Sequence, residues 1–406
     1  MLRISQLKLP VEHTEAQLKK KLLKTAHIKE QDLKQFFIRK RSVDGRKKPE
    51  LYYVYTVDLI VANEEHVKKI SKGKLQTVQE KNYHIPEHGA KKLRKRPVVI
   101  GSGPAGLFCA YLLAFEGYEP LVIERGAPVR ERQKVVEQFW KDGILNTASN
   151  VQFGEGGAGT FSDGKLNTLV KDKFGRNRFV LETFVKFGAP EEILWESKPH
   201  IGTDILIEVV ERMREEIIRL GGEFLFHSQV TDILPKENCL IVNGCHRIET
   251  DAAVFAVGHS ARDTFQMLFD RNVAMKSKSF AIGVRAEHRQ DMIDEAMYGR
   301  KERGPLGAAA YKLTAQLENG RGVYTFCMCP GGVVVPAASQ EGMVVTNGMS
   351  DFARDGTNAN AALAVSVTPD DFGTAPLDGM RFQQELERRA FTAGGRGYGA
   401  PAQDAK

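Results

Sequence analysis

The sequence contains few cysteines and lacks a long apolar run. Its five cysteines, in 406 residues, are too few and too unevenly placed for a disulfide framework, and no charged-then-apolar leader opens the chain. A reducing, cytoplasmic compartment is therefore expected. No stretch approaches the roughly 18 uninterrupted apolar residues that a membrane helix needs, so we expect a soluble protein without a membrane partner. With 42% apolar residues, the chain can bury the cores of two or three domains.

Acidic charge is scarce in the first part of the chain. Residues 1–96 carry 24 lysines and arginines against 11 acidic residues, whereas the remainder carries 34 against 40. The formal net charge of +7 thus hides a basic N-terminal module and a slightly acidic body. Basic clusters interleaved with aromatic residues are typical of RNA-binding modules, although such runs are more often a solvated face. We therefore predict RNA or an acidic partner for residues 1–96; the aromatic residues are Phe36, Phe37, Tyr52, Tyr53 and Tyr55.

The N-terminal module is expected to have a small α+β fold. Alternating apolar residues predict a first strand, and a basic amphipathic helix opens near Thr14. Two further strands are expected at residues 35–41 and 50–62. The turn-rich segment Val43-Asp44-Gly45-Arg46 predicts the reversal of a hairpin between them.

Residues 97–123 have the pattern of a strand, a glycine turn, a helix and a second strand. The turn reads Gly101-Ser102-Gly103-Pro104-Ala105-Gly106, which fits G-x-G-x-x-G in its required context. The first glycine permits the tight turn, the second lets the backbone approach a pyrophosphate, and the third allows close packing of helix against strand. Glu124 ends the second strand, where a carboxylate can bind ribose hydroxyls and disfavours a 2′-phosphate. The unit predicts a dinucleotide site at the helix N-terminus.

The segment from Asn150 to Asn167 contains five glycines within eleven residues. Backbone that lacks Cβ atoms can lie flat against a planar ring or an anion. The polar side chains at the far end of the segment, Ser162, Asp163 and Lys165 among them, can donate and accept around the edge of a cofactor. A cation in that place stabilises the anionic reduced ring of a flavin. The alternative is a flexible surface loop.

The rest of the chain alternates helical and strand patterns. An amphipathic helix capped by Thr203 or Asp204 is expected to end at Gly221-Gly222, and a strand is expected at residues 223–230. From about Met275 onward, runs rich in glycine, alanine and strand-forming residues predict a second, sheet-containing domain. The predicted boundaries are 1–75 for the module, 76–96 for a linker, 97–270 for the dinucleotide-binding domain, 271–395 for a substrate domain and 396–406 for a tail.

Five segments resemble the uncharacterised FAD-dependent dehydrogenases of bacteria; they are residues 96–106, 150–168, 198–204, 258–264 and 326–332. The resemblance covers almost the entire chain, the basic module included. It implies an α/β fold in which a Rossmann-like FAD-binding domain of the glutathione-reductase type carries an inserted substrate domain. Members of that family run on for over a hundred residues to a glycine-rich segment that closes on the flavin, so by this likeness the chain is C-terminally truncated.

The same likeness draws the FAD site from several segments. It assigns to Val230 a backbone contact with the adenine, and it places Gly258 at the crossover that returns to the FAD domain. The expected FAD-binding residues are Gly101, Gly103, Pro104, Ala105, Gly106, Glu124, Arg125, Gly157, Gly159, Thr160, Ser162, Asp163, Val230 and Gly258.

Four residues are candidates for the chemistry. Cys327 and Cys329 could shuttle electrons or bind a soft metal, but no His or Cys nearby in sequence completes a metal site, and buried small side chains are the alternative. His259 is a candidate acid or base, with a hydrogen-bonded structural histidine as the alternative. Lys165 is the fourth, and simple solvation is its alternative. We predict no metal site.

These features predict a FAD-dependent oxidoreductase, a dehydrogenase that transfers hydride between flavin and an unidentified small substrate. A second nucleotide fingerprint with strand context is lacking, so NAD(P)H is expected only as a transient electron donor. Two alternatives stay open. One is a flavin-dependent RNA-modifying enzyme that captures its substrate with the basic module, and the other is a catalytically silent flavin-binding protein.

Overall fold

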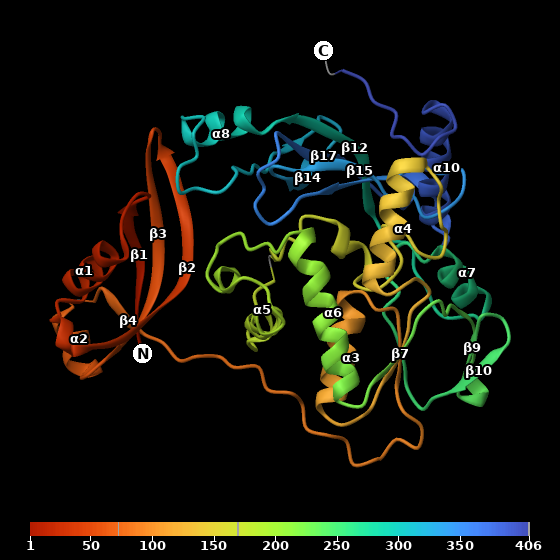
Figure 1. Cartoon of the computed structure of the whole chain (residues 1–406), viewed down its shortest axis with the longest axis horizontal. Coiled ribbons are helices and arrows are strands. Elements are labelled where there is room, and N and C mark those ends of the chain that lie inside the picture. Colours follow the sequence, from red (N-terminus) through yellow and green to blue (C-terminus); the bar gives the residue numbers. More distant parts are fainter. Residues whose placement is uncertain (72, 169, 405–406) are drawn as a thin grey trace.

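The computed structural model describes residues 1–71, 73–168 and 170–404 and has three parts (Figure 1). The N-terminal module stands to one side, a second part is built on a short parallel sheet, and a third part holds a larger antiparallel sheet. A long segment without regular secondary structure, residues 78–97, connects the module to the parallel sheet. None of the helices within the described ranges combines the length and the apolar character that a membrane crossing requires.

The N-terminal module is a four-stranded antiparallel sheet with two helices. Its elements are β1 (Leu2–Pro10), α1 (Glu15–Ala26), η1 (Glu30–Asp32), β2 (Leu33–Lys47), β3 (Glu50–Val61), α2 (Glu64–Ile70) and β4 (Leu75–Thr77), with the strand order β2-β3-β1-β4. Thr14 begins α1 with a capping box that it forms with Gln17. Leu18 and Leu22 of this helix are buried against the sheet, which explains why a strongly basic helix stays attached to it.

The hairpin between β2 and β3 turns later than the sequence predicts. Residues 43–46 are still part of β2, and the chain reverses at Lys48-Pro49. The buried carboxylate of Asp44 explains the error, because it binds Lys8 Nζ at 2.9 Å and Arg46 Nε at 2.8 Å. The polar residues that suggested turn chemistry therefore stabilise a strand, and Pro49, which has no N–H to donate, interrupts the pairing.

The second part is a parallel sheet with the order β11-β5-β6-β7. Its strands are β5 (Val98–Ile100), β6 (Leu121–Ile123), β7 (Glu223–Leu225) and β11 (Ala253–Phe255). β5 and β6 are buried throughout, so their residues are uninterrupted Val, Leu and Ile rather than an alternating pattern. The predicted strand, turn, helix and strand around the glycine motif are all present, with α3 at Pro104–Phe115.

Helices cover this sheet and share its largest apolar core. α3 and α6 (Thr203–Arg219) lie side by side, with α4 (Val129–Asp142) and α5 (Arg176–Lys186) beside them (Figure 1). The predicted helix capped by Thr203 or Asp204 begins as expected, but its N-cap is Gly202, whose φ is +80°. The hydroxyl of Thr203 instead donates to the backbone carbonyls of Thr160 and Ser162 at 3.0 and 2.7 Å. It therefore ties α6 to residues 150–167, the glycine-rich loop.

A small antiparallel sheet follows β7. It consists of β8 (Val230–Leu234), β9 (Cys239–Val242) and β10 (His246–Glu249), with η4 (Pro235–Glu237) at the predicted turn. The single strand predicted for residues 223–230 is wrong, because the chain leaves β7 after Leu225. His227 has a φ of +52° and its amide donates to the carbonyl of Gly126, while the amide of Ser228 donates to the carbonyl of Glu124. These contacts hold the intervening segment across the end of β6.

The third part contains a sheet of order β12-β17-β14-β13 and a two-stranded ribbon. The strands are β12 (Phe280–Arg289), β13 (Thr314–Gln316), β14 (Gly322–Cys329) and β17 (Asn358–Val367), and the ribbon is β15 (Val333–Pro336) with β16 (Thr346–Met349). The remaining helices are η2 (Gly157–Phe161), η3 (Glu191–Leu194), α7 (Arg262–Asp270), α8 (Gln290–Tyr298), α9 (Pro369–Phe372) and α10 (Asp378–Ala393). α10 lies at the end of this sheet near α4 and α7 (Figure 1).

The module contacts both other parts. Arg41 on β2 forms backbone hydrogen bonds with the segment after η3, from its amide to the carbonyl of Trp195 at 2.7 Å and from the amide of Ser197 to its carbonyl at 2.9 Å. The Tyr53 hydroxyl donates to the carbonyl of Pro305 at 2.9 Å, and Leu306 is buried in the module's own apolar core.

Candidate functional site

The glycine turn between β5 and α3 has the geometry that the sequence predicts. Gly101 has a φ of +97°, and a Cβ there would lie 2.6 Å from the carbonyl oxygen of Ala256. A Cβ at Gly106 would collide with the carbonyl of Gly101, so the third glycine permits the close approach of helix and turn. Gly103 is different, since the Cα of Gly157 at 3.8 Å is the nearest atom to a Cβ built there. A Cβ at Gly103 would therefore make an ordinary van der Waals contact and no clash.

The N-terminus of α3 faces the glycine-rich loop. Gly103 is the N-cap and Pro104 the first helical residue, and no side chain caps the helix. Its first-turn amides therefore keep their hydrogen-bonding capacity and the positive end of the helix dipole. Gly157 packs against Gly103 and Pro104 from the other side. The Thr160 hydroxyl oxygen in the same loop is fully buried and has no hydrogen-bond partner among the described residues.

Glu124 lies at the end of β6, as predicted, and is buried. One carboxylate oxygen accepts from the Ser102 amide at 2.9 Å and the Ser102 hydroxyl at 2.8 Å. The other accepts from the amides of Gly126 at 3.0 Å and Gly154 at 3.1 Å. Glu124 thus joins the glycine turn to the glycine-rich loop. Of these four donors, the hydroxyl of Ser102 is the one that can rotate away from the carboxylate.

Arg132 is a site residue that the sequence analysis missed. Its side chain, on α4, is completely buried, and the guanidinium donates to the carbonyls of Asn150 and Gly157 at 2.9 Å and of Glu155 at 2.6 Å. Burial lowers the pKa of Arg132 to about 10, so the group stays charged at neutral pH. The signal was present in the sequence, because arginine occupies one position of the otherwise apolar stripe at residues 129, 136 and 139.

Glu155 provides a second fixed point in the loop. Its carboxylate is buried, accepts from the amide of Val129 at 2.6 Å and pairs with Arg214 Nε of α6 at 2.8 Å. Burial raises the pKa of Glu155 above its ordinary value, although Arg214 acts in the opposite direction. α4 and α6 thus both hold the loop, which is not the flexible surface segment considered as its alternative.

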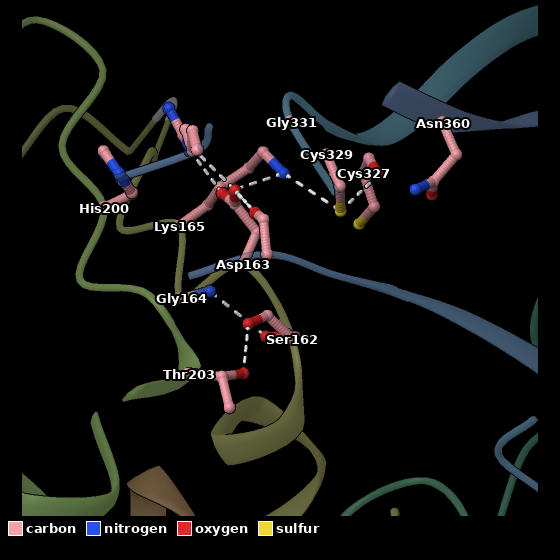
Figure 2. Close-up of polar contacts among 12 residues, drawn as sticks. Ser162, Asp163, Gly164, Lys165, His200, Thr203, Cys327, Cys329, Gly331 and Asn360 are labelled. Atoms are coloured by element: carbon pink, nitrogen blue, oxygen red, sulfur yellow. Dashed lines mark hydrogen bonds and ion pairs between the residues drawn. The ribbon is translucent and has the colours of Figure 1, made fainter. Parts of the chain in front are cut away.

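A second polar cluster lies at the C-terminal end of the loop (Figure 2). The buried carboxylate of Asp163 accepts from Arg354 Nε at 2.8 Å, from the Ser350 hydroxyl, and pairs with Lys165 Nζ at 3.1 Å. Burial raises the pKa of Asp163, but the hydrogen bonds and charge of Arg354 outweigh it, and the pKa lies below its ordinary value. Asp163 is therefore an ionised anchor between the loop and the third part of the molecule.

Lys165 brings the two cysteines into this cluster. Its Nζ lies 3.6 Å from Cys329 Sγ, and Cys329 Sγ lies 3.3 Å from the carbonyl oxygen of Cys327 (Figure 2). Arg285 Nη2 donates to that carbonyl at 3.3 Å. Desolvation raises the pKa of both thiols, through full burial at Cys329 and through neighbouring protein atoms at the more exposed Cys327, and Lys165 counteracts this effect in part. Both cysteines rest as thiols at neutral pH.

Two further residues border the cluster. His200 stacks on Phe352 with ring centroids 5.2 Å apart, and its Nε2 lies 2.9 Å from the carbonyl oxygen of Phe352. Burial lowers the pKa of His200 and the charge of Arg354 adds to the effect, so the ring is neutral at pH 7. The sequence analysis missed His200, Arg285, Ser350 and Arg354 as site residues, because no local motif marks them.

The other predicted residues lie outside this cluster. His259 is exposed, with its Nε2 3.3 Å from the Ser260 hydroxyl. Partial desolvation by neighbouring protein atoms and the charge of Arg262 lower its pKa. Arg125 forms a bidentate pair with Asp263 at 2.9 Å. Val230 is buried at the start of β8, and Gly258 has a φ of +71° with no atom within 4 Å of a built Cβ. The structure thus joins Lys165 to the cysteines and gives no direct contact from them to His259 within the described ranges.

A separate cleft of about 560 Å³ lies between β2 of the module and the second part. Phe36, Trp195 and Lys34 line it, together with Arg39 and Arg178. Arg39 pairs with Asp58 and Arg178 with Glu182, so much of the positive charge is neutralised. Tyr53 and Tyr55, two of the aromatic residues considered for RNA stacking, are buried in the module core instead.

Fold and site together define a mixed α/β protein with a Rossmann-like nucleotide-binding domain. A family model described as an NAD(P)-binding Rossmann-like domain matches residues 99–129, a domain of unknown function matches 1–60, and a model described as a FAD-dependent protein, C-terminal domain-like, matches 279–406. The last description confirms FAD as the predicted cofactor.

An uncharacterized protein of Clostridium beijerinckii is 49% identical over 414 residues, which cover 99% of this chain and 76% of that protein. The chain belongs to the same family as this protein, and the model that matches residues 279–406 describes that part as belonging to a FAD-dependent protein.

Solved structures with a related arrangement are more distant. The halogenase PltM is 10% identical, with a TM-score of 0.33 over 75% of this chain and 57% of that one. The tetracycline destructase Tet(51) is 13% identical, with a TM-score of 0.33 over 74% of this chain and 62% of that one. The chain thus spans less than two thirds of either protein. A likeness of this degree does not extend to substrate or activity.

Proposed function

We propose that this protein is a FAD-dependent oxidoreductase that transfers hydride between flavin and a small substrate. One observation carries the proposal. The uncapped N-terminus of α3 faces a rigid glycine-rich loop, and a buried Thr160 hydroxyl without a partner belongs to that loop. These are donors of the kind that a pyrophosphate requires. Gly103 has no side chain that would keep a pyrophosphate away from the backbone.

The residues present fit FAD. The amides of Ala105 and Gly106 and the hydroxyl of Thr160 would hold the pyrophosphate, and Glu124 would hold the ribose once Ser102 turns away. Bound FAD would supply two-electron redox chemistry. Arg132 and Glu155 keep the loop in place, Asp163 fixes the position of Lys165, and Lys165 contributes a positive charge next to the loop. We also propose that the FAD-binding domain is of the glutathione-reductase type and that the activity is that of a dehydrogenase.

Flavin content tests the proposal. The purified protein, after incubation with FAD, should absorb at about 450 nm, where oxidised flavins absorb. Gly103→Val should abolish this band because the valine side chain would occupy the place of the pyrophosphate. The substitution should not prevent folding, since a Cβ there makes only an ordinary contact with Gly157. Gly89→Val is the matched control, since a Cβ at Gly89 meets no atom within 4 Å. Unchanged flavin binding in Gly103→Val contradicts the proposal.

The electron donor is tested separately. We propose NADH or NADPH as a transient donor, because a single dinucleotide fingerprint is found in the chain. Anaerobic mixing of the flavin-loaded protein with each nucleotide should bleach the flavin band. If neither nucleotide bleaches it, the reductant is the substrate itself.

RNA capture is a second candidate function, favoured by the aromatic and basic lining of the cleft between β2 and Trp195. The protein should then retain single-stranded RNA in a salt-dependent way, and Lys34→Glu together with Trp195→Ala should weaken the retention. Lys20→Glu changes the same charge on α1 outside the cleft and serves as the control. Equal weakening by Lys20→Glu would indicate a diffuse charge effect rather than a site.

A further inference from the structure

The two cysteines of β14 differ in exposure although they are one residue apart. Cys327 is exposed, whereas Cys329 is 2% exposed. Cys327 has a φ of +45°, and the register of β14 against β17 shifts between Phe326 and Cys329. A β-branched or ordinary residue rarely adopts such a φ, and a bulge of this kind re-aims side chains, often beside active sites. The strand is therefore locally distorted where the thiols lie.

The distortion leaves the two sulfur atoms next to each other. Figure 2 shows the two sulfur atoms beside each other, and Cys329 contributes to the raised pKa of the Cys327 thiol. Lys165 Nζ lies 3.6 Å from the sulfur of the buried Cys329, and its charge also acts on the Cys327 thiol. Cys327 is thus the more exposed residue of the pair, and Cys329 is held beside a cation.

A buried polar group without a partner lies beside the same pair. Asn360 is the cross-strand partner of Cys329 in β17 and is fully buried. Its carboxamide oxygen accepts from Arg285, but its amide nitrogen has no hydrogen-bond partner among the described residues. Side chains of cross-strand partners point to the same face, with Cβ atoms about 5 Å apart. A negative charge on Cys329 would therefore form near an unused N–H donor as well as near Lys165.

We propose that Cys327 and Cys329 form a thiol–disulfide exchange centre for small-molecule disulfides, with Cys327 as the attacking thiol and Cys329 as the resolving thiol. This exchange goes beyond the proposed function and does not depend on bound flavin. Its substrate class is a low-molecular-weight disulfide that reaches the exposed sulfur. Lys165 contacts the resolving sulfur and stabilises its thiolate.

The exchange balances without another reactant. The Cys327 thiolate attacks one sulfur of the disulfide, the S–S bond of the substrate breaks, and the released thiolate takes the proton that Cys327 lost. The Cys329 thiolate then attacks Cys327 Sγ, the mixed disulfide breaks, and the second substrate thiolate takes the proton of Cys329. Two protein thiols are oxidised to one disulfide, and one substrate disulfide is reduced to two thiols.

Mass spectrometry of the flavin-free protein tests the pair. After incubation with glutathione disulfide, acid quenching and alkylation, the tryptic peptide 322–354 should have lost two hydrogens and carry no glutathione. In Cys329→Ser, glutathione should stay attached to Cys327, and in Cys327→Ser no adduct should form at Cys329. Cys245 is an exposed cysteine without a neighbouring thiol and is the internal reference. A stable glutathione adduct on wild-type Cys327, or reaction no faster than at Cys245, overturns the proposal.

Substitution of Lys165 tests its role. Lys165→Met should slow the closure of the Cys327–Cys329 disulfide about tenfold, because an opposite charge this close favours the thiolate by at least that factor. Lys165→Arg keeps the charge and should restore most of the rate. The charged groups that face the pair are Lys165, Arg285 and Asp163. The wild-type rate should rise from pH 7 to 9, because a larger fraction of the cysteines is then thiolate. A rate that is unchanged in Lys165→Met removes Lys165 from the mechanism.

Discussion

The guanidinium of Arg132 donates a hydrogen bond of 2.6 Å to the backbone carbonyl of Glu155, in the middle of the glycine-rich loop. The same group also holds the carbonyls of Asn150, Val151 and Gly157. A loop with this many glycines has a large conformational entropy when free. The buried Arg132 side chain from α4 therefore fixes a loop whose glycines alone would leave it flexible.

Arg132→Met should lower the free energy of unfolding by about 3 kcal/mol or more, because several buried carbonyls lose their donor together. Urea denaturation followed by circular dichroism measures the change. Arg130→Met, on the same helix, removes an exposed arginine that pairs with Glu211, and should cost under about 1 kcal/mol. Similar losses in the two variants would show that Arg132 does not organise the loop.

Gly106→Ala should prevent correct packing of α3, because the new Cβ would collide with the backbone of Gly101. We expect a loss of about 3 kcal/mol or more, since a backbone carbonyl cannot move aside as a side chain can. Gly117→Ala is the control: it is strained by a φ of +77° but meets no atom within 4 Å, and should cost about 1–2 kcal/mol. Thermal unfolding of the flavin-free proteins distinguishes the two.

Glu124→Gln should destabilise the flavin-free protein and abolish flavin binding. All four contacts of the carboxylate come from donors, so an amide NH₂ must face two of them. The expected loss of stability is about 1–3 kcal/mol. Ser102→Ala removes only the rotatable donor and should leave flavin affinity equal or higher, as measured by titration of the flavin fluorescence. Weaker binding in Ser102→Ala would mean that the serine itself contacts the ligand.

The pair of Asp163 and Arg354 should make stability depend on pH. The folded-state pKa of Asp163 is lowered, so its contribution is complete above the unfolded pKa of about 3.9 and is lost as the pH falls through the lower folded value. Asp163→Asn should therefore be less stable than the wild type by about 3 kcal/mol at pH 7 and approach it below pH 4 or so. Asp291→Asn alters an exposed pair with Arg289 and should show no comparable convergence. A difference that is constant down to pH 2 would contradict an ionised Asp163.

Local patterns predicted the nucleotide-binding unit well. The strands, the turn and α3 around Gly101–Gly106 are contiguous in sequence, and the third glycine has a steric reason within that segment, because a Cβ at Gly106 would collide with the carbonyl of Gly101. The division of residues 223–230 into β7 and β8 was not predictable in the same way. It depends on amide contacts from His227 and Ser228 to Gly126 and Glu124, about a hundred residues earlier in the chain.

The cysteine cluster shows the same limit. Lys165 and Cys329 were both candidates, but the contact between them joins residues 164 positions apart. Arg354 and Ser350, in the segment that follows β16, contact Asp163, and no short motif marks either residue. Pattern analysis thus named Lys165 and the two cysteines as candidates, whereas their grouping depends on how the third part of the molecule packs on the loop.

The burial of Leu306 in the module's core has a consequence for how the chain unfolds. This leucine belongs to the third part of the molecule, yet it packs among the buried apolar side chains of β1, β3 and α1. A module whose interior is completed by a distant segment cannot melt without exposing that segment too. Heat should therefore unfold the module and the third part in one cooperative transition, and the module cannot be exchanged as an independent cassette between proteins that lack a matching apolar side chain.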